Sequence, residues 1–228
     1  NANGTGPYRL ERYEPDVRTV LKANPAWWGK GDPRNGNLDE VSFVSIRQDA
    51  TRLAALASGE IACVLAEPAM TNIGIVHPQP GYHDALREIT RRTGTLLIID
   101  ETHTICTGVG GYTREYGLQP DILTLGKPIA GGVPAAVYGL SAEVAQRVQS
   151  QINRDEADTG GIGGTLAGNA LSMAAMRATL EQVLVQAAYD RTIPLARRFT
   201  DGVQAVIDEF ALPWHVSRLG CRAEYWFC

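Results

Sequence analysis

One nearly apolar run, Thr95–Ile99, constrains the fold of this chain more than any other segment. It reads TLLII and lacks the alternation of polar and apolar positions that marks a half-buried strand. Such a run is typical of a strand covered on both faces. A predicted helix from Pro80 to about Arg92, ended by Gly94, comes before it, and strands and helices alternate after it. This alternation predicts an α/β fold in which helices cover a mostly parallel sheet.

The rest of residues 61–228 continues the same pattern. We expect short strands at Ile61–Leu65, Ile122–Leu125 and Ala135–Gly139, with a helix beginning near Ser141. Two long helices are expected after them, over Leu166–Val185 and Asp190–Phe210.

Residues 1–60 have a different character, because their pattern favours strands joined by turns. Strands are predicted at Tyr8–Tyr13, Val17–Ala23 and Val41–Ile46, and then a helix over Ala50–Ser58 that Asp49 would cap. We therefore expect two parts, a small β-rich segment over 1–60 and a partial α/β domain over 61–228.

Composition limits the classes of function. Among 228 residues, 21 are basic and 25 acidic, so the net charge of −4 argues against nucleic-acid and polybasic membrane partners. No apolar run is long enough for a transmembrane helix. The four cysteines form no C-x-x-C pair, so no metal site is expected.

Two candidate reactive residues follow predicted strands directly. Asp100 ends the TLLII strand, and Lys127 follows the next strand, ILTL. Ligands of open α/β sheets bind at the carboxyl ends of strands. A lysine there suits pyridoxal phosphate, because its amine forms a Schiff base with the aldehyde while a carboxylate pairs with the ring nitrogen. An ordinary ion pair between strand ends explains the same spacing. Lys127 is the only lysine in residues 61–228.

A series of separated motifs adds to this interpretation. In order, they are EPAMTNIG from Glu67, LLIIDETHT from Leu96, PDILTLGKPIAGGVPAAVYG from Pro120 and GGTLAGNALSMAAMRATLE from Gly163. This series resembles the class III aminotransferases of the fold-type I pyridoxal-phosphate enzymes, the group that includes glutamate-1-semialdehyde aminomutase. The resemblance covers roughly residues 61–228.

The resemblance assigns roles to the two candidates. Lys127 stands at the family's Schiff-base lysine, which also moves the proton of the substrate, and Asp100 stands at the carboxylate that pairs with the pyridine nitrogen. Glu67 would support Asp100, and Asn72 would lie on the substrate side.

Three further residues are implied as cofactor contacts. Thr102 stands where the family has a valine that packs on the ring, and its methyl group can pack there. His103 stands where some members have a glutamine near the phenolic oxygen; a histidine there serves that oxygen or faces the substrate. Thr165 matches the threonine that reaches the phosphate of the neighbouring subunit's cofactor.

The family further implies a cytoplasmic homodimer that takes a small-molecule amino donor and a keto or aldehyde acceptor. The Lys127–Asp100 pair is common to transaminases and aminomutases, so it does not separate the two activities.

Residues 3–60 resemble a different family, the family 5 solute-binding proteins of peptide-type ABC importers. The resemblance rests on GTGPYRL from Gly4, NPAWWG from Asn24 and ATRLAALASGE from Ala50. We therefore expect a chimera joined between Gly59 and Leu65, with both parts cut short. The alternatives are a periplasmic peptide-binding protein and an inactive remnant that folds and dimerises without a cofactor.

Overall fold

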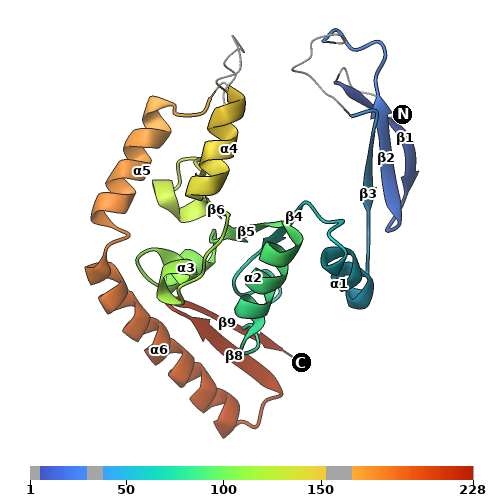
Figure 1. The fold of residues 1–228 in the computed structure, drawn as a ribbon. Helices are drawn as coiled ribbons and strands as arrows, with labels where there is room; N and C mark the ends of the chain where they lie inside the picture. The colour runs from blue at the N-terminus through green and yellow to red at the C-terminus, as the bar shows by residue number, and fades with distance from the viewer. Residues whose placement is uncertain (1–5, 30–37, 153–165, 228) are drawn as a thin grey trace. The chain divides into compact units, whose positions relative to one another are not determined.

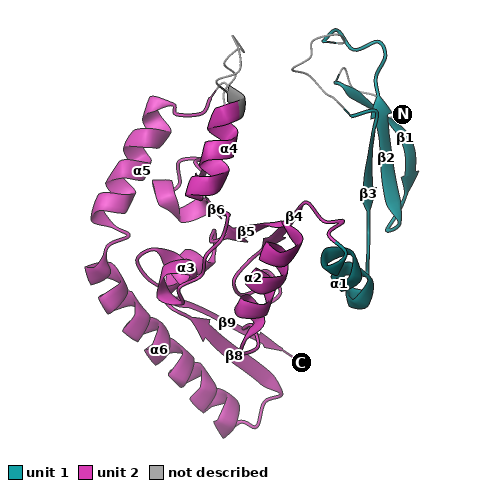
Figure 2. Ribbon diagram, in the orientation of Figure 1, with its two compact units in different colours: residues 1–58 teal, residues 59–228 magenta. Residues whose placement is uncertain are grey.

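The structure of this chain is a computed structural model that describes residues 6–29, 38–152 and 166–227. The chain divides into two compact units, residues 1–58 and residues 59–228 (Figure 2). Within the described residues, every helix is too short or too polar to serve as a transmembrane span.

The first unit is an antiparallel sheet followed by one helix. Its strands β1 (Tyr8–Glu14), β2 (Arg18–Ala23) and β3 (Glu40–Val44) pair in chain order, and α1 spans Asp49–Ala57. The predicted β-rich segment is confirmed to within two residues at each boundary.

The predicted role of Asp49 as the helix cap is wrong. Gln48 holds the cap position and makes no capping hydrogen bond through its side chain. Asp49 is already helical and forms an ion pair with Arg52, three residues further along the helix. Its carboxylate therefore acts in the first turn of α1, where a negative charge stabilises the helix dipole.

The second unit is built on a four-stranded sheet in chain order, formed by β4 (Cys63–Ala66), β5 (Leu96–Asp100), β6 (Ile122–Leu125) and β7 (Val137–Leu140) (Figure 1). The first three strands are parallel and β7 is antiparallel to β6. A parallel connection needs a long crossover. The segment between β6 and β7 holds only the short 3₁₀ turn η2 (Lys127–Ala130), so the chain reverses direction. The α/β, mostly parallel fold is thus confirmed.

The helices of the second unit occupy the segments between and after these strands. They are α2 (Tyr82–Thr93), α3 (Gly111–Glu115), α4 (Ala142–Ile152), α5 (Ala170–Gln182) and α6 (Gln186–Glu209), followed by the antiparallel hairpin of β8 (Trp214–Leu219) and β9 (Arg222–Phe227). Helix α2 packs on β5, α4 on β7, α5 on η2 and α6 on β8.

The starts of the two long helices each differ by four residues from the sequence-based expectation. Helix α5 begins at Ala170, four residues after the predicted start, because the Asn169 side chain accepts a hydrogen bond from the Ser172 amide (2.9 Å) and caps the helix there. Helix α6 begins four residues before the predicted Asp190. The predicted end of α2 is correct, since Gly94 adopts a φ of +71° and closes the helix.

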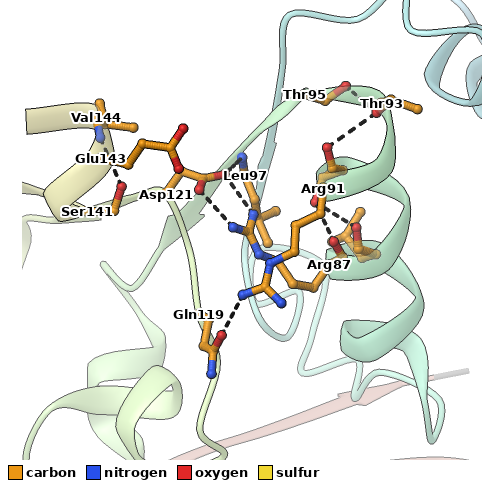
Figure 3. Close-up of polar contacts among 12 residues, drawn as sticks. Arg87, Arg91, Thr93, Thr95, Leu97, Gln119, Asp121, Ser141, Glu143 and Val144 are labelled. Carbon is orange, nitrogen blue, oxygen red and sulfur yellow. Dashed lines mark hydrogen bonds and ion pairs between the residues drawn. The ribbon is translucent and has the colours of Figure 1, made fainter. Parts of the chain in front are cut away.

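An ion pair fixes α2 against the sheet (Figure 3). The guanidinium of Arg87 donates two hydrogen bonds to the carboxylate of Asp121, at 2.7 and 2.8 Å. The same carboxylate accepts a hydrogen bond from the Leu97 amide at 2.8 Å, at the start of β5. Asp121 lies just before β6, so one side chain joins a helix and two strands.

Burial alone would raise the pKa of Asp121, but the Arg87 guanidinium, the Leu97 amide and the charge of Arg91 hold that pKa below its ordinary value of 3.8. A carboxyl whose pKa is lower in the folded state stabilises the fold above its unfolded value. That stabilisation disappears as the pH falls through the folded value.

We predict that Arg87→Ala lowers the free energy of unfolding at pH 7 by about 2–4 kcal/mol, because it leaves Asp121 partly buried without its partner. Urea unfolding measures this loss. The matched control is Arg92→Ala, an exposed position on the same helix. The difference between wild type and Arg87→Ala should shrink below about pH 4, as Asp121 takes up a proton. A difference that is as large in acid as at pH 7 would contradict the assignment.

Candidate functional site

Three polar residues stand at the carboxyl ends of the three parallel strands. Glu67 follows β4, Asp100 is the last residue of β5, and Lys127 comes two residues after the end of β6. The strands are neighbours in the sheet (Figure 1), so their ends lie along one edge. The sequence predicted ligand chemistry at the second and third of these ends, and the pairing brings Glu67 to the same edge.

The backbone at Lys127 is strained. Its φ is +42°, in the left-handed region that L-residues other than glycine rarely adopt. Packing holds this turn in place, because Ile129 is fully buried and packs with Met176 of α5. The side chain of Lys127 itself is exposed. Strain of this kind persists where surrounding packing enforces it, and it is concentrated at functional positions.

The amine of Lys127 ends a continuous chain of hydrogen bonds. Its Nζ contacts Nε2 of His103, and Nδ1 of His103 contacts the hydroxyl of Thr71 at 2.5 Å. The Thr71 hydroxyl in turn donates to Oε2 of Glu67. Thr71 is 1% exposed, so its hydroxyl makes both of these contacts inside the fold.

The environment of His103 disfavours its charged form. Burial is the main cause that lowers the pKa of His103 below 6.5, and the nearby charges of Lys127 and Arg222 lower it further. Glu67 and Asp100 act in the opposite direction without overcoming them. The ring is therefore neutral at neutral pH.

Asp100 and Thr102 form a tight turn at the end of β5. Oδ1 of Asp100 accepts a hydrogen bond from the Thr102 amide at 2.9 Å, and its side chain is half-buried. The hydroxyl of Thr102 approaches the buried Gly126, where a Cβ would lie 3.7 Å from it. The Thr102 side chain thus lies against the segment that carries Lys127.

Glu101 organises this turn and was not among the predicted site residues. It is 1% exposed, and its carboxylate accepts hydrogen bonds from the Thr104 hydroxyl and from the amides of Tyr112 (3.1 Å) and Thr113. These amides are the open donors at the start of α3. The sequence signal is an acidic residue shortly before the glycine-rich start of a helix, Gly108–Gly111.

The predicted reactive lysine lines a cleft of about 630 Å³. The hairpin β8–β9 closes one side of it: Gly220 adopts a φ of +56°, and a Cβ there would stand 2.1 Å from the carbonyl oxygen of Cys106. Only glycine allows this approach. The lining residues are Thr102, His103, Ile105, Cys106, Lys127, Pro128, Leu184, Tyr189, Cys221 and Arg222.

Two other polar groups in this cleft, the Cys106 thiol and the Arg222 guanidinium, are poorly suited to react with a ligand. Burial raises the pKa of the Cys106 thiol to about 12, so the thiol stays protonated and is a poor nucleophile. Nε of Arg222 donates to Glu224 (2.7 Å), and its Nη2 donates to the carbonyl of Thr71 (3.1 Å). The lysine is the cleft's available amine.

Asn72 and Thr165 are the remaining predicted site residues. Asn72 lies next to Thr71 and is exposed. Thr165, the predicted phosphate contact, lies outside the described residues. The donor set that is described fits pyridoxal phosphate: a primary amine in an open cleft that Thr102 also lines, and a half-buried carboxylate at the adjoining strand end.

Comparisons with known proteins agree with this chemistry. The family model for class III aminotransferases matches residues 28–220. Glutamate-1-semialdehyde 2,1-aminomutase 2 of Brevibacillus brevis is 39% identical over 75% of this chain and 39% of its own length. A crystal structure of a glutamate-1-semialdehyde aminomutase from Pseudomonas aeruginosa PAO1 with PMP superimposes with a TM-score of 0.73. It is 49% identical over 78% of this chain and 40% of that chain.

An omega-transaminase structure from Sphaerobacter thermophilus is similar at 32% identity and a TM-score of 0.66, over 75% of this chain and 38% of that chain. This chain spans about two-fifths of the length of the curated relatives it matches. The family match begins at residue 28, inside the segment whose motifs resemble solute-binding proteins.

We predict that Glu101→Gln lowers the free energy of unfolding by about 2–3 kcal/mol, because an amide NH₂ would face the backbone donors of α3. Glu115→Gln is the matched control, since it makes the same chemical change at an exposed position of α3. Urea unfolding of both variants decides the point. Equal stability of the two variants would show that the carboxylate of Glu101 does not hold the turn.

Proposed function

Because the chain belongs to the class III aminotransferases, we propose that it binds pyridoxal phosphate through Lys127. We further propose that it transfers an amino group from a small-molecule donor to a keto or aldehyde acceptor. The observation that carries this proposal is the placement of the Lys127 amine in a cleft at the carboxyl end of β6, beside the β5 strand end that holds Asp100.

Each residue has a physical task in this proposal. When bound, pyridoxal phosphate supplies an aldehyde for the amine and a ring that takes up the electron pair released at the substrate's α-carbon. Lys127 takes the proton from that carbon at Nζ and returns it. Asp100 offers its carboxylate to the ring nitrogen, Thr102 offers its methyl group to the ring face, and Thr165 would donate to the phosphate.

Among related activities, we favour an aminomutase. Relatives that bear the aminomutase name are 39% and 49% identical to this chain, whereas the omega-transaminase is 32% identical. A mutase moves the amino group within one molecule, so it turns over a single substrate. A transaminase requires a separate donor and acceptor. Turnover of one compound without added acceptor therefore distinguishes the two.

The assembly and location of the protein belong to the same proposal. We infer a cytoplasmic homodimer from the family resemblance, with Thr165 serving the cofactor of the neighbouring subunit. Sedimentation of the protein with and without pyridoxal phosphate tests the dimer.

A separate origin of residues 1–60 is a second proposal. It is supported by the motifs that resemble peptide-type solute-binding proteins and by a compact antiparallel unit that ends at residue 58. Sequencing of genomic DNA across codons 59–65 tests the junction. Binding of a peptide library by the purified protein would support the alternative function of an importer's solute-binding protein, whereas inactive protein without cofactor binding would support the remnant.

We predict that pyridoxal phosphate followed by borohydride labels Lys127 and leaves Lys22 unlabelled. The amine of Lys127 lies in the cleft, whereas that of Lys22 is paired with Glu11 on an exposed strand. Peptide mapping by mass spectrometry identifies the modified residue.

The matched control is Lys127→Arg, which keeps the positive charge and removes the primary amine. It should abolish the label at this peptide without loss of folding. An unlabelled Lys127 in folded wild-type protein would overturn the proposed function.

A further inference from the structure

We propose that Glu67, Thr71 and His103 form a fixed hydrogen-bond chain that positions the amine of Lys127. This hydrogen-bond chain holds His103 as its Nδ1–H tautomer, with the unprotonated Nε2 facing Nζ of Lys127. His103 is then a positioning residue for Lys127, a role separate from the contacts to the cofactor that the sequence suggested for it. The proposal rests on the proposed function for its consequence and on the described contacts for its geometry.

The direction of the chain follows from its acidic end. A carboxylate can only accept hydrogen bonds, so the contact between Glu67 and Thr71 uses the single hydroxyl proton of Thr71. That hydroxyl has no second proton to give. At its other contact, 2.5 Å from His103, the Thr71 oxygen must therefore accept.

The tautomer of His103 follows in turn. Since the Thr71 oxygen accepts, Nδ1 of His103 carries the proton. A neutral imidazole with a proton on Nδ1 has a lone pair on Nε2. This lone pair faces Nζ of Lys127, which has only N–H groups to offer in its charged form. All three contacts are satisfied by one arrangement of protons.

The charges around His103 are consistent with that arrangement. Lys127 and Arg222 face the ring as cations, and Glu67 and Asp100 face it as anions. Burial and the two cations lower the pKa of His103 below 6.5. Nε2 therefore stays bare through the neutral range and becomes protonated only in more acidic solution, where it can no longer accept from Lys127.

A fixed acceptor restricts the orientation of the lysine amine. An N–H held by Nε2 limits rotation about the Cε–Nζ bond, so that once the amine loses a proton its lone pair is confined to two orientations. The reaction of an amine with a carbonyl carbon is faster when the attacking nitrogen is already oriented toward that carbon. Thr71 is buried and Glu67 is half-buried, so the chain behind His103 is held within the fold.

Nuclear magnetic resonance of uniformly ¹⁵N-labelled protein, without added cofactor, tests the tautomer directly. A long-range ¹H–¹⁵N spectrum separates protonated from bare ring nitrogens for each of the four histidines. At pH 7.5 we expect Nδ1 of His103 to be protonated and Nε2 to be bare. Lowering the pH should protonate Nε2 with a midpoint below 6.5. A protonated Nε2 at pH 7.5 in the wild type overturns the proposal.

Two variants of Thr71 separate the hydrogen bond from packing. Thr71→Val keeps the shape but removes the oxygen that accepts from Nδ1 of His103, so the Nδ1–H form loses one of its two partners and the proportion of the Nε2–H form should rise. Thr71→Ser keeps the hydroxyl and should retain the wild-type tautomer. An unchanged proportion of the two tautomers in a folded Thr71→Val variant contradicts the proposed chain.

The rate at which pyridoxal phosphate labels Lys127 supplies the second readout. Thr71→Val should slow the labelling about five-fold, as expected from the loss of one hydrogen bond, and Thr71→Ser should not. Equal rates in the two variants would overturn the positioning role. If the tautomer is as expected but wild-type Lys127 is never labelled, the proposed function fails while the hydrogen-bond chain stands.

Discussion

The parallel pairing of β4, β5 and β6 is the constraint on which the site depends. Parallel strands in neighbouring positions end at the same edge of a sheet, so the residues that follow them converge whatever their distance in sequence. Glu67, Asp100 and Lys127 reach one edge in this way. A slip of one residue in any of these strands would turn its side chains to the opposite face and take the site apart.

Two carboxylates hold this sheet to its helices, one at each end of the strands. Asp121 ties α2 and the start of β5 to β6, and Glu101 ties the end of β5 to α3. Both accept several hydrogen bonds, which offsets the cost of their burial. The reactive groups are left more exposed, because a lysine amine that must meet a ligand cannot be enclosed by the fold.

Much of the fold, and two residues of the candidate site, could be predicted from the sequence. The TLLII run, the alternation of strands and helices, and polar residues directly after two strands point to the α/β fold and to Lys127 and Asp100. The direction of β7 could have been inferred from the short connection before it. The contact of Thr71 with His103 could not, because it joins two loops 32 positions apart whose approach depends on strand register and packing. The role of Thr165 stays a prediction.

We propose that Lys127 is the residue through which this chain holds pyridoxal phosphate. A crystal structure of the protein grown with the cofactor tests it most directly. We expect continuous density from Nζ of Lys127 to the cofactor, with the carboxylate of Asp100 within hydrogen-bonding distance of the ring nitrogen. Cofactor bound elsewhere, with Nζ of Lys127 still against His103, would contradict it.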